Sequence, residues 1–120
     1  MLLLLEFCNL AVRFSVKPSP PKILSATRER DGTVVMKWDA PQNTGGAEIT
    51  GYALFQRSTT HGDWQEIDRV PGTSTQYTYK NLLPGSWQFA VSAVNTAGDG
   101  YRMDWPLTVS IPKAIGMRIG

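Results

Sequence analysis

The side chains that could do chemistry are few in this chain, and they form no catalytic pattern. The one histidine, His61, stands in a turn signal next to Gly62, and no second histidine or cysteine lies near it in the sequence to complete a metal site. Asp63, Glu66 and Asp68 lie along one predicted strand edge, and a carboxylate pair can act as acid and base, but this pattern favours a solvated face. We therefore expect a protein that is not an enzyme and needs no metal or cofactor.

Two glycine-rich segments, residues 45–46 (Gly-Gly) and 98–100 (Gly-Asp-Gly), do not match phosphate-binding loops. The first has no Lys-Ser or Lys-Thr pair after it, and neither segment is expected to open a helix. Residues 30–32 (Arg-Asp-Gly) have the wrong order for an Arg-Gly-Asp adhesion tripeptide. We interpret all three segments as turns.

Residues 95–105 carry the side-chain types that are typical of binding surfaces. Tyrosine, arginine and tryptophan are the residues most enriched at interaction hot spots. The predicted interaction residues in this segment are Asn95, Asp99, Tyr101, Arg102 and Trp105. Two alternatives stay open for Tyr101 and Trp105: they plug the end of a domain, or they form a stacking platform for a carbohydrate.

Composition and charge bound the class of protein. The 120 residues are 42% hydrophobic and 18% charged, which is typical of one globular domain. The net charge of +2 is small and the 12 basic residues are scattered, so nucleic acid binding is not expected. The single cysteine, Cys8, excludes a disulfide within the chain, and the domain must be held together by packing.

No stretch of the sequence approaches the roughly eighteen apolar residues that a membrane span needs. The leucines at positions 2–5 suggest a signal peptide, but no basic residue precedes them, Glu6 interrupts the run, and no small-x-small cleavage site follows. We therefore expect no cleavable signal peptide and treat residues 1–19 as an N-terminal arm.

The arm contains a strand-like pattern. Four apolar residues alternate with other residues: Leu10, Val12, Phe14 and Val16. This period of two predicts a strand with one apolar face, and residues 18–21 (Pro-Ser-Pro-Pro) predict a stiff, extended spacer that lets the strand reach away from the domain. A lone strand cannot satisfy its backbone or cover its apolar face, so we expect residues 9–17 to pair with another chain, or with an exposed edge of this one, by β-augmentation.

Between residues 20 and 112, short strand patterns alternate with turn signals, and no helical pattern of any length occurs. The predicted strands are residues 22–27, 33–38, 49–58, 64–70, 75–79, 87–94 and 107–111. Alternation predicts a seven-stranded antiparallel sandwich in which six side chains are buried together: Trp38, Tyr52, Leu54, Phe89, Val91 and Val109.

Several landmarks occur in order along these strands. Trp38 is followed by residues 40–41 (Ala-Pro), then by residues 45–52 (GGAEITGY) and 81–85 (NLLPG), and last by the alternating run 87–95, which Ala-Gly closes. Together they resemble a fibronectin type III domain over about three quarters of the chain.

The resemblance implies an all-β, immunoglobulin-like sandwich of fibronectin type III topology. The N-terminal arm, residues 1–19, is then an extra strand outside the domain at residues 20–112, and residues 113–120 are a tail. Such domains usually have a tyrosine at the start of the sixth strand, whose hydroxyl bonds back to the preceding corner. This chain has Trp87 there, and because an indole N–H donates but cannot accept, we expect a closed corner with different geometry.

This fold is a scaffold, so its function depends on loops and edges. We expect a non-catalytic structural or protein–protein interaction module, a subunit of a multi-chain assembly such as a phage virion (tail, baseplate or capsid accessory protein), which docks through its N-terminal strand. In this fold the 39–48 loop lies at the same end as residues 95–105. The alternative is a carbohydrate-binding or adhesion accessory domain of a secreted protein that binds a surface glycan. The expected location is the virion or the extracellular space.

Overall fold

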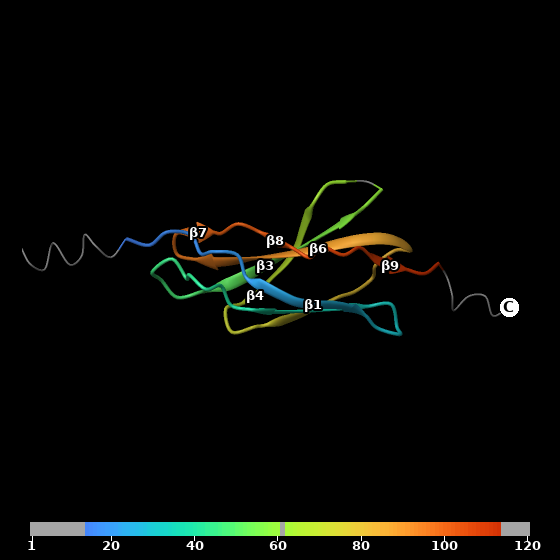
Figure 1. Cartoon of the computed structure of the whole chain (residues 1–120), viewed down its shortest axis with the longest axis horizontal. Coiled ribbons are helices and arrows are strands. Elements are labelled where there is room, and N and C mark those ends of the chain that lie inside the picture. Colours follow the sequence, from blue (N-terminus) through green and yellow to red (C-terminus); the bar gives the residue numbers. More distant parts are fainter. Residues whose placement is uncertain (1–13, 61, 114–120) are drawn as a thin grey trace, which may run out of the picture.

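The computed structural model describes residues 14–60 and 62–113, and these form two layers of antiparallel β-strands without a helix (Figure 1). The first layer has the order β1-β2-β5. Its strands are β1 (Lys22–Arg28), β2 (Val34–Asp39) and β5 (Gln76–Tyr79). The described part of the chain therefore contains no helix that could cross a membrane.

The second layer has the order β4-β3-β6-β7, and two more short strands also pair with β6. Its strands are β3 (Gly51–Ser58), β4 (Gln65–Pro71), β6 (Gly85–Asn95), β7 (Gly98–Asp99), β8 (Met103–Asp104) and β9 (Val109–Ile111). The turn between β3 and β4 rises away from both layers (Figure 1). The all-β sandwich predicted from the sequence is confirmed.

The last predicted strand, residues 107–111, differs from the structure. The chain pairs with β6 in three short pieces, and the final piece begins only at Val109. Pro106 has no N–H to donate to a ladder, and Leu107 is 62% exposed. The described residues therefore contain nine strands where the sequence predicts seven.

The core between the layers follows the predicted alternation. Five of the six predicted core residues are at most 1% exposed, and they are Trp38, Tyr52, Leu54, Phe89 and Val91. Val109 is only partly buried and packs against this cluster. Tyr79 joins the core, where its hydroxyl donates to the backbone oxygen of Phe55 at 3.0 Å, and burial raises the pKa of Tyr79 well above its usual value. The inward face of each layer was therefore predictable from period-two patterning.

The corner before β6 is closed by Trp87, as expected. Its indole Nε1 donates to the carbonyl oxygen of Leu83 at 2.8 Å. Trp87 thus supplies the backward hydrogen bond that a tyrosine hydroxyl usually provides in this fold.

Candidate interaction surface

The segment 14–20 is fastened to two loops that lie far away in the sequence. The Val16 N–H donates to the Gly45 carbonyl at 2.9 Å, and the Ser19 N–H donates to the Asn43 carbonyl at 2.9 Å. From the end of β6, where the other loop begins, Asn95 Nδ2 donates to the Val16 carbonyl at 2.8 Å. We call the surface formed by residues 14–20, 39–48 and 95–101 the N-terminal end surface.

Two glycines allow this close approach. A Cβ atom on Gly45 would overlap the Val16 carbonyl oxygen, and a Cβ atom on Gly100 would overlap the Pro18 carbonyl oxygen. Gly45 also has a φ of +82°, a region that side chains with a Cβ atom rarely adopt. The loops are therefore shaped to receive the backbone of the N-terminal segment.

This packing corrects the expectation that residues 18–21 lead away from the domain. Pro18 and Pro21 are buried, and Ser19 Oγ is within hydrogen-bond distance of the Asn43 backbone. The prolines make the segment stiff and extended, but the Ser19 N–H and hydroxyl find partners on Asn43 of the 39–48 loop. The segment is thus part of the folded domain.

Asn95, a predicted interaction residue, holds the N-terminal end surface together from inside. It is 4% exposed, and its Nδ2 donates to both the Val16 and the Thr44 carbonyls at 2.8 Å. Its Oδ1 accepts from the Ala97 N–H at 2.7 Å. These three bonds occupy the amide within the chain, so Asn95 supports the surface and does not face outward.

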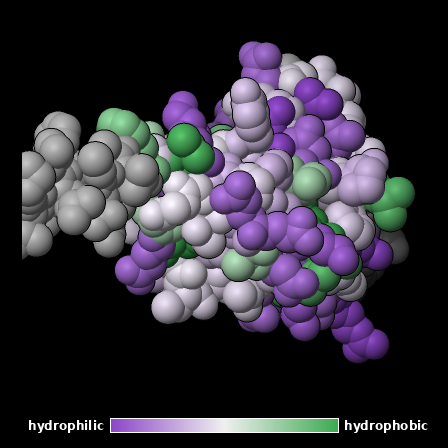
Figure 2. Space-filling model, turned by 60° about the vertical axis from the view of Figure 1, so that its left-hand side comes forward, coloured by the Kyte–Doolittle hydropathy of each residue, from purple (hydrophilic) through white to green (hydrophobic). Residues whose placement is uncertain are grey.

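Apolar side chains project from this fixed backbone. Phe14 is 83% exposed, Val16 is 61% exposed and Tyr101 is 84% exposed. Figure 2 shows apolar residues at this end of the molecule, next to polar and neutral ones. Residues 14–17 lie in no strand of the structure, and the other two residues of the predicted stripe, Leu10 and Val12, lie outside the described residues. Strand pairing with another chain stays a prediction.

A second predicted residue, Asp99, is engaged in an ion-pair network. Arg69 on β4 reaches Glu66 at 2.7 Å and Asp99 on β7 at 2.5 Å. To reach Asp99, the Arg69 side chain lies across β3 and β6. Its partner on β3, Ala53, and the residue paired with Ala53 on β6, Ser92, are both small. The carboxylates of Glu66 and Asp99 raise the pKa of the Arg69 guanidinium above its usual value.

The third predicted residue, Arg102, belongs to an aromatic stack on the outer face of the second layer. Its guanidinium lies 4.5 Å from the centre of the Trp64 ring and 5.7 Å from that of Phe55. Arg57 lies on Trp64 as well, at 4.9 Å. Because cation–π contacts and the Arg102–Asp104 pair hold these side chains, the stack fastens the β3–β4 hairpin to the segment before β8.

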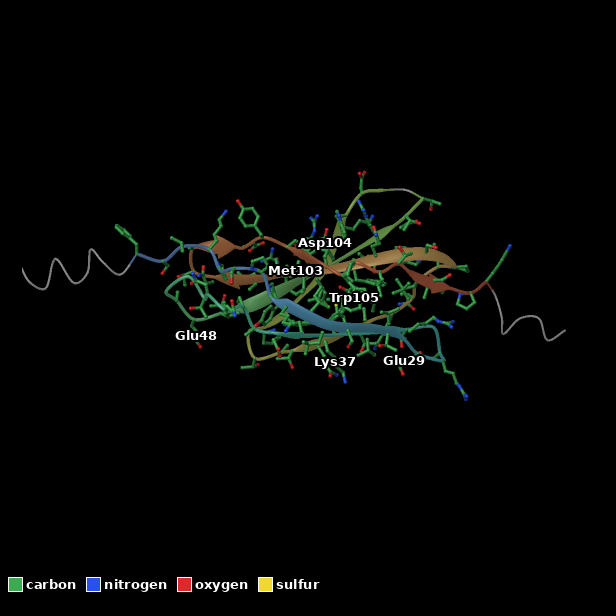
Figure 3. All side chains as sticks on the ribbon, in the orientation of Figure 1. Glu29, Lys37, Glu48, Met103, Asp104 and Trp105 are labelled. Carbon is green, nitrogen blue, oxygen red and sulfur yellow. The ribbon has the colours of Figure 1, made fainter. Side chains whose placement is uncertain are left out.

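Phe55 and Trp64 were not among the predicted site residues. Phe55 is out of phase with the inward residues Tyr52 and Leu54, and this outward-facing aromatic was the signal in the sequence. Trp105 is half-buried, and its backbone N–H donates to the Phe89 carbonyl at 2.8 Å. Met103 and Asp104 form β8 of the second layer, and Trp105 follows them (Figure 3).

In the part of the chain that the structure describes, no group of three or more His, Cys, Asp or Glu side chains has an arrangement that could hold a metal ion. His61, the one histidine, lies outside the described residues. The N-terminal end surface, with its exposed apolar side chains and hydrogen-bonded Val16 backbone, is the candidate functional site.

Comparisons with known proteins place the chain in a family. The model of the fibronectin type III domain matches residues 19–110, and the chain belongs to this family. Titin of Drosophila melanogaster is 37% identical over 84 residues, which cover 69% of this chain. Myomesin-2 of Homo sapiens is 33% identical over 88 residues, which cover 72% of this chain.

A solved structure agrees with these relatives. The crystal structure of domains A168–A170 from titin matches with a TM-score of 0.68 at 27% identity, and the match covers 82% of this chain and 34% of that one. The chain spans 6% of the length of myomesin-2 and a share of Drosophila titin that rounds to 0%.

Proposed function

We propose that this chain is a non-catalytic structural module that contacts another protein segment through its N-terminal end surface. One observation carries the proposal: Phe14, Val16 and Tyr101 are at least 61% exposed, while both backbone groups of Val16 are hydrogen bonded, the N–H to Gly45 and the carbonyl to Asn95. Exposed apolar side chains on a fixed backbone are favourable for binding, because less freedom is lost when a partner docks.

The relatives favour a partner that is itself a folded domain. The titin structure contains domains A168 to A170, and this chain matches 34% of it. A partner at the N-terminal end surface would cover the apolar side chains that residues 14–20 expose there. The partner's identity is part of the proposal, as is docking by the predicted strand at residues 9–17.

The setting of this module is also a proposal. A phage virion was expected from the sequence, but the relatives named above are animal proteins, and they favour a larger structural polypeptide instead. The virion and the extracellular space stay predicted locations. The carbohydrate-binding alternative depends on Tyr101, since Trp105 is half-buried and offers less of its ring for stacking.

Site-specific photo-crosslinking tests the proposal. A photoreactive benzoylphenylalanine replaces Tyr101 in the full chain, expressed in the cells that produce it, and the same residue replaces exposed Lys37 on β2 as the matched control. We expect covalent protein adducts from position 101 that are absent from position 37. Glycan adducts alone, no adducts, or the same adducts from both positions would contradict the proposal.

A further inference from the structure

The opposite end of the sandwich holds a basic hollow. Glu29 and Glu48 mark the two ends in Figure 3, and Glu29 lies on the side of this hollow. Three cationic side chains line it: Arg28, Arg30 and Lys80. Arg28 ends β1, Arg30 lies in the turn after it, and Lys80 follows β5. The fold therefore brings Arg30 and Lys80 together, although they are 50 residues apart in the sequence.

The carboxylate that lines the hollow is already engaged. Asp31 Oδ1 accepts from the Thr33 N–H at 3.0 Å and from the Thr33 hydroxyl at 2.7 Å. These bonds to Thr33 lower the pKa of Asp31, and the charge of Lys80 lowers it further. Asp31 is therefore ionised at neutral pH and offsets one of the three positive charges lining the hollow.

The cations of the hollow differ from the arginines of the sheet face. Arg57, Arg69 and Arg102 each hold a side-chain hydrogen bond. Arg28, Arg30 and Lys80 hold neither a side-chain hydrogen bond nor an ion pair with any other residue that the structure describes. Their donors are thus available to an anion from outside.

Beside these charges the lining of the hollow is apolar. Leu82, Pro84, Ile111 and Pro112 contribute to it. Leu82 and Pro112 are half-buried and Ile111 is 7% exposed, so an apolar group of a ligand could displace water from this lining. Cations beside an apolar lining suit a ligand that carries both carboxylates and apolar side chains.

We propose that the basic hollow binds an acidic, partly apolar segment of a partner protein. Carboxylates of the segment pair with Arg28, Arg30 and Lys80, and an apolar side chain between them packs on Leu82 and Pro84. The charges steer the encounter, and the apolar contact adds affinity that salt does not screen. This contact is separate from the N-terminal end surface and stands whether or not that surface binds a partner.

Binding of synthetic peptides to the full chain tests this proposal. A short fluorescein-labelled peptide of alternating glutamate and leucine is titrated, and fluorescence anisotropy is measured at low and at physiological ionic strength. We expect saturable binding that weakens as salt is added. The double variant Arg30→Glu with Lys80→Glu should bind at least about tenfold more weakly, because two attractions become repulsions.

Two controls separate the proposed site from general attraction of anions. Exposed Lys37 lies on β2 outside the hollow, so the double variant Lys22→Glu with Lys37→Glu makes the same change in net charge and should bind within about twofold of the parent. Peptides of alternating glutamine and leucine, or of glutamate and glycine, should both bind more weakly than the glutamate–leucine peptide.

Three results would overturn the proposal. The first is no saturable binding of the glutamate–leucine peptide, and the second is equal loss in both double variants. The third is equal binding of the glutamate–glycine peptide, since this would show a plain anion site without an apolar contact. Circular dichroism of each variant confirms that it is folded.

Discussion

At the N-terminal end of the sandwich, polar backbone groups are hydrogen bonded and apolar side chains are exposed. At the other end, charged side chains are exposed and the apolar groups line the hollow between them. The first arrangement needs glycines and a buried asparagine, because two backbones approach closely. The second needs only side chains at the surface. One fold can therefore carry two contact surfaces whose shape and stability depend on different residues.

The shared core should have the largest effect, because both ends rest on it. Trp38 is 1% exposed and packs on Tyr52 with ring centres 5.2 Å apart. Trp38→Ala should lower the free energy of unfolding by about 3–5 kcal/mol through loss of contacts and a cavity. Thermal and denaturant unfolding measure this loss. Trp64→Ala, on the outer face, is the control and should cost less; a Trp38→Ala protein that melts at the parent temperature would contradict the assignment of the core.

A Gly→Ala substitution at each end compares how far the stability of the two ends depends on glycine. Gly45→Ala should cost about 2–4 kcal/mol, since its Cβ atom would overlap the Val16 carbonyl and its φ is +82°. Gly32→Ala, beside the basic hollow, also has a positive φ, of +88°, but has open space around it, and should cost only about 1 kcal/mol. Chemical denaturation measures both. Equal losses would mean that the close approach of Val16 adds nothing.

Removal of the buried amide should weaken only the N-terminal end surface. Asn95→Ala leaves the Val16 and Thr44 carbonyls without this donor, which should cost about 1–3 kcal/mol. Asn43→Ala is the matched control, because Asn43 is exposed and its side chain accepts one bond, from the Gly45 N–H. An Asn95→Ala protein that is as stable as the Asn43→Ala protein would show that the three bonds of Asn95 do not hold the loops.

The smallest effect is expected at the basic hollow. The pKa of Asp31 is lowered in the folded state, so its contribution to stability is present above the unfolded pKa and is lost as the pH falls through the lower folded value. Asp31→Asn should therefore reduce the slope of stability against pH in the acid range. Asp39→Asn is the control, since Asp39 is exposed and its side chain accepts no hydrogen bond from the described residues. If the slope of stability against pH is unchanged in both variants, the bonds from Thr33 do not stabilise the ionised form of Asp31 in the folded protein.

The fold was predictable where one local rule decided it. Alternation identified Trp38, Tyr52, Leu54, Phe89 and Val91 as buried, because side chains on a strand point to opposite faces in turn. The last strand was predicted less well. Its alternation begins at Leu107, but pairing with β6 begins only at Val109, because Leu107 follows Pro106 and is exposed.

The candidate site was predictable only in part, because its decisive contacts join distant residues. Asn95 bonds to Val16, 79 residues away, and no local pattern shows that pair. Residues 95–105 were predicted to share an end with the 39–48 loop. The bond from Asn95 to Thr44 confirms this for the start of the segment, while Arg102 stacks on Trp64 at the outer face of the second layer. The spacer was misjudged, since proline content indicates stiffness and does not show which surface the backbone packs against.

Hydrogen exchange of single backbone amides tests the central claim, that residues 14–20 are an integral part of the domain. The N–H groups of Val16 and Ser19 donate to loop carbonyls, so NMR should show both protected from exchange in the full chain. In Asn95→Ala the protection of Val16 should fall sharply, while that of Trp38 changes no more than the overall loss of stability requires. Exchange of Val16 and Ser19 at the rate of an unstructured chain would contradict the account, because the N-terminal end surface would then have no fixed backbone.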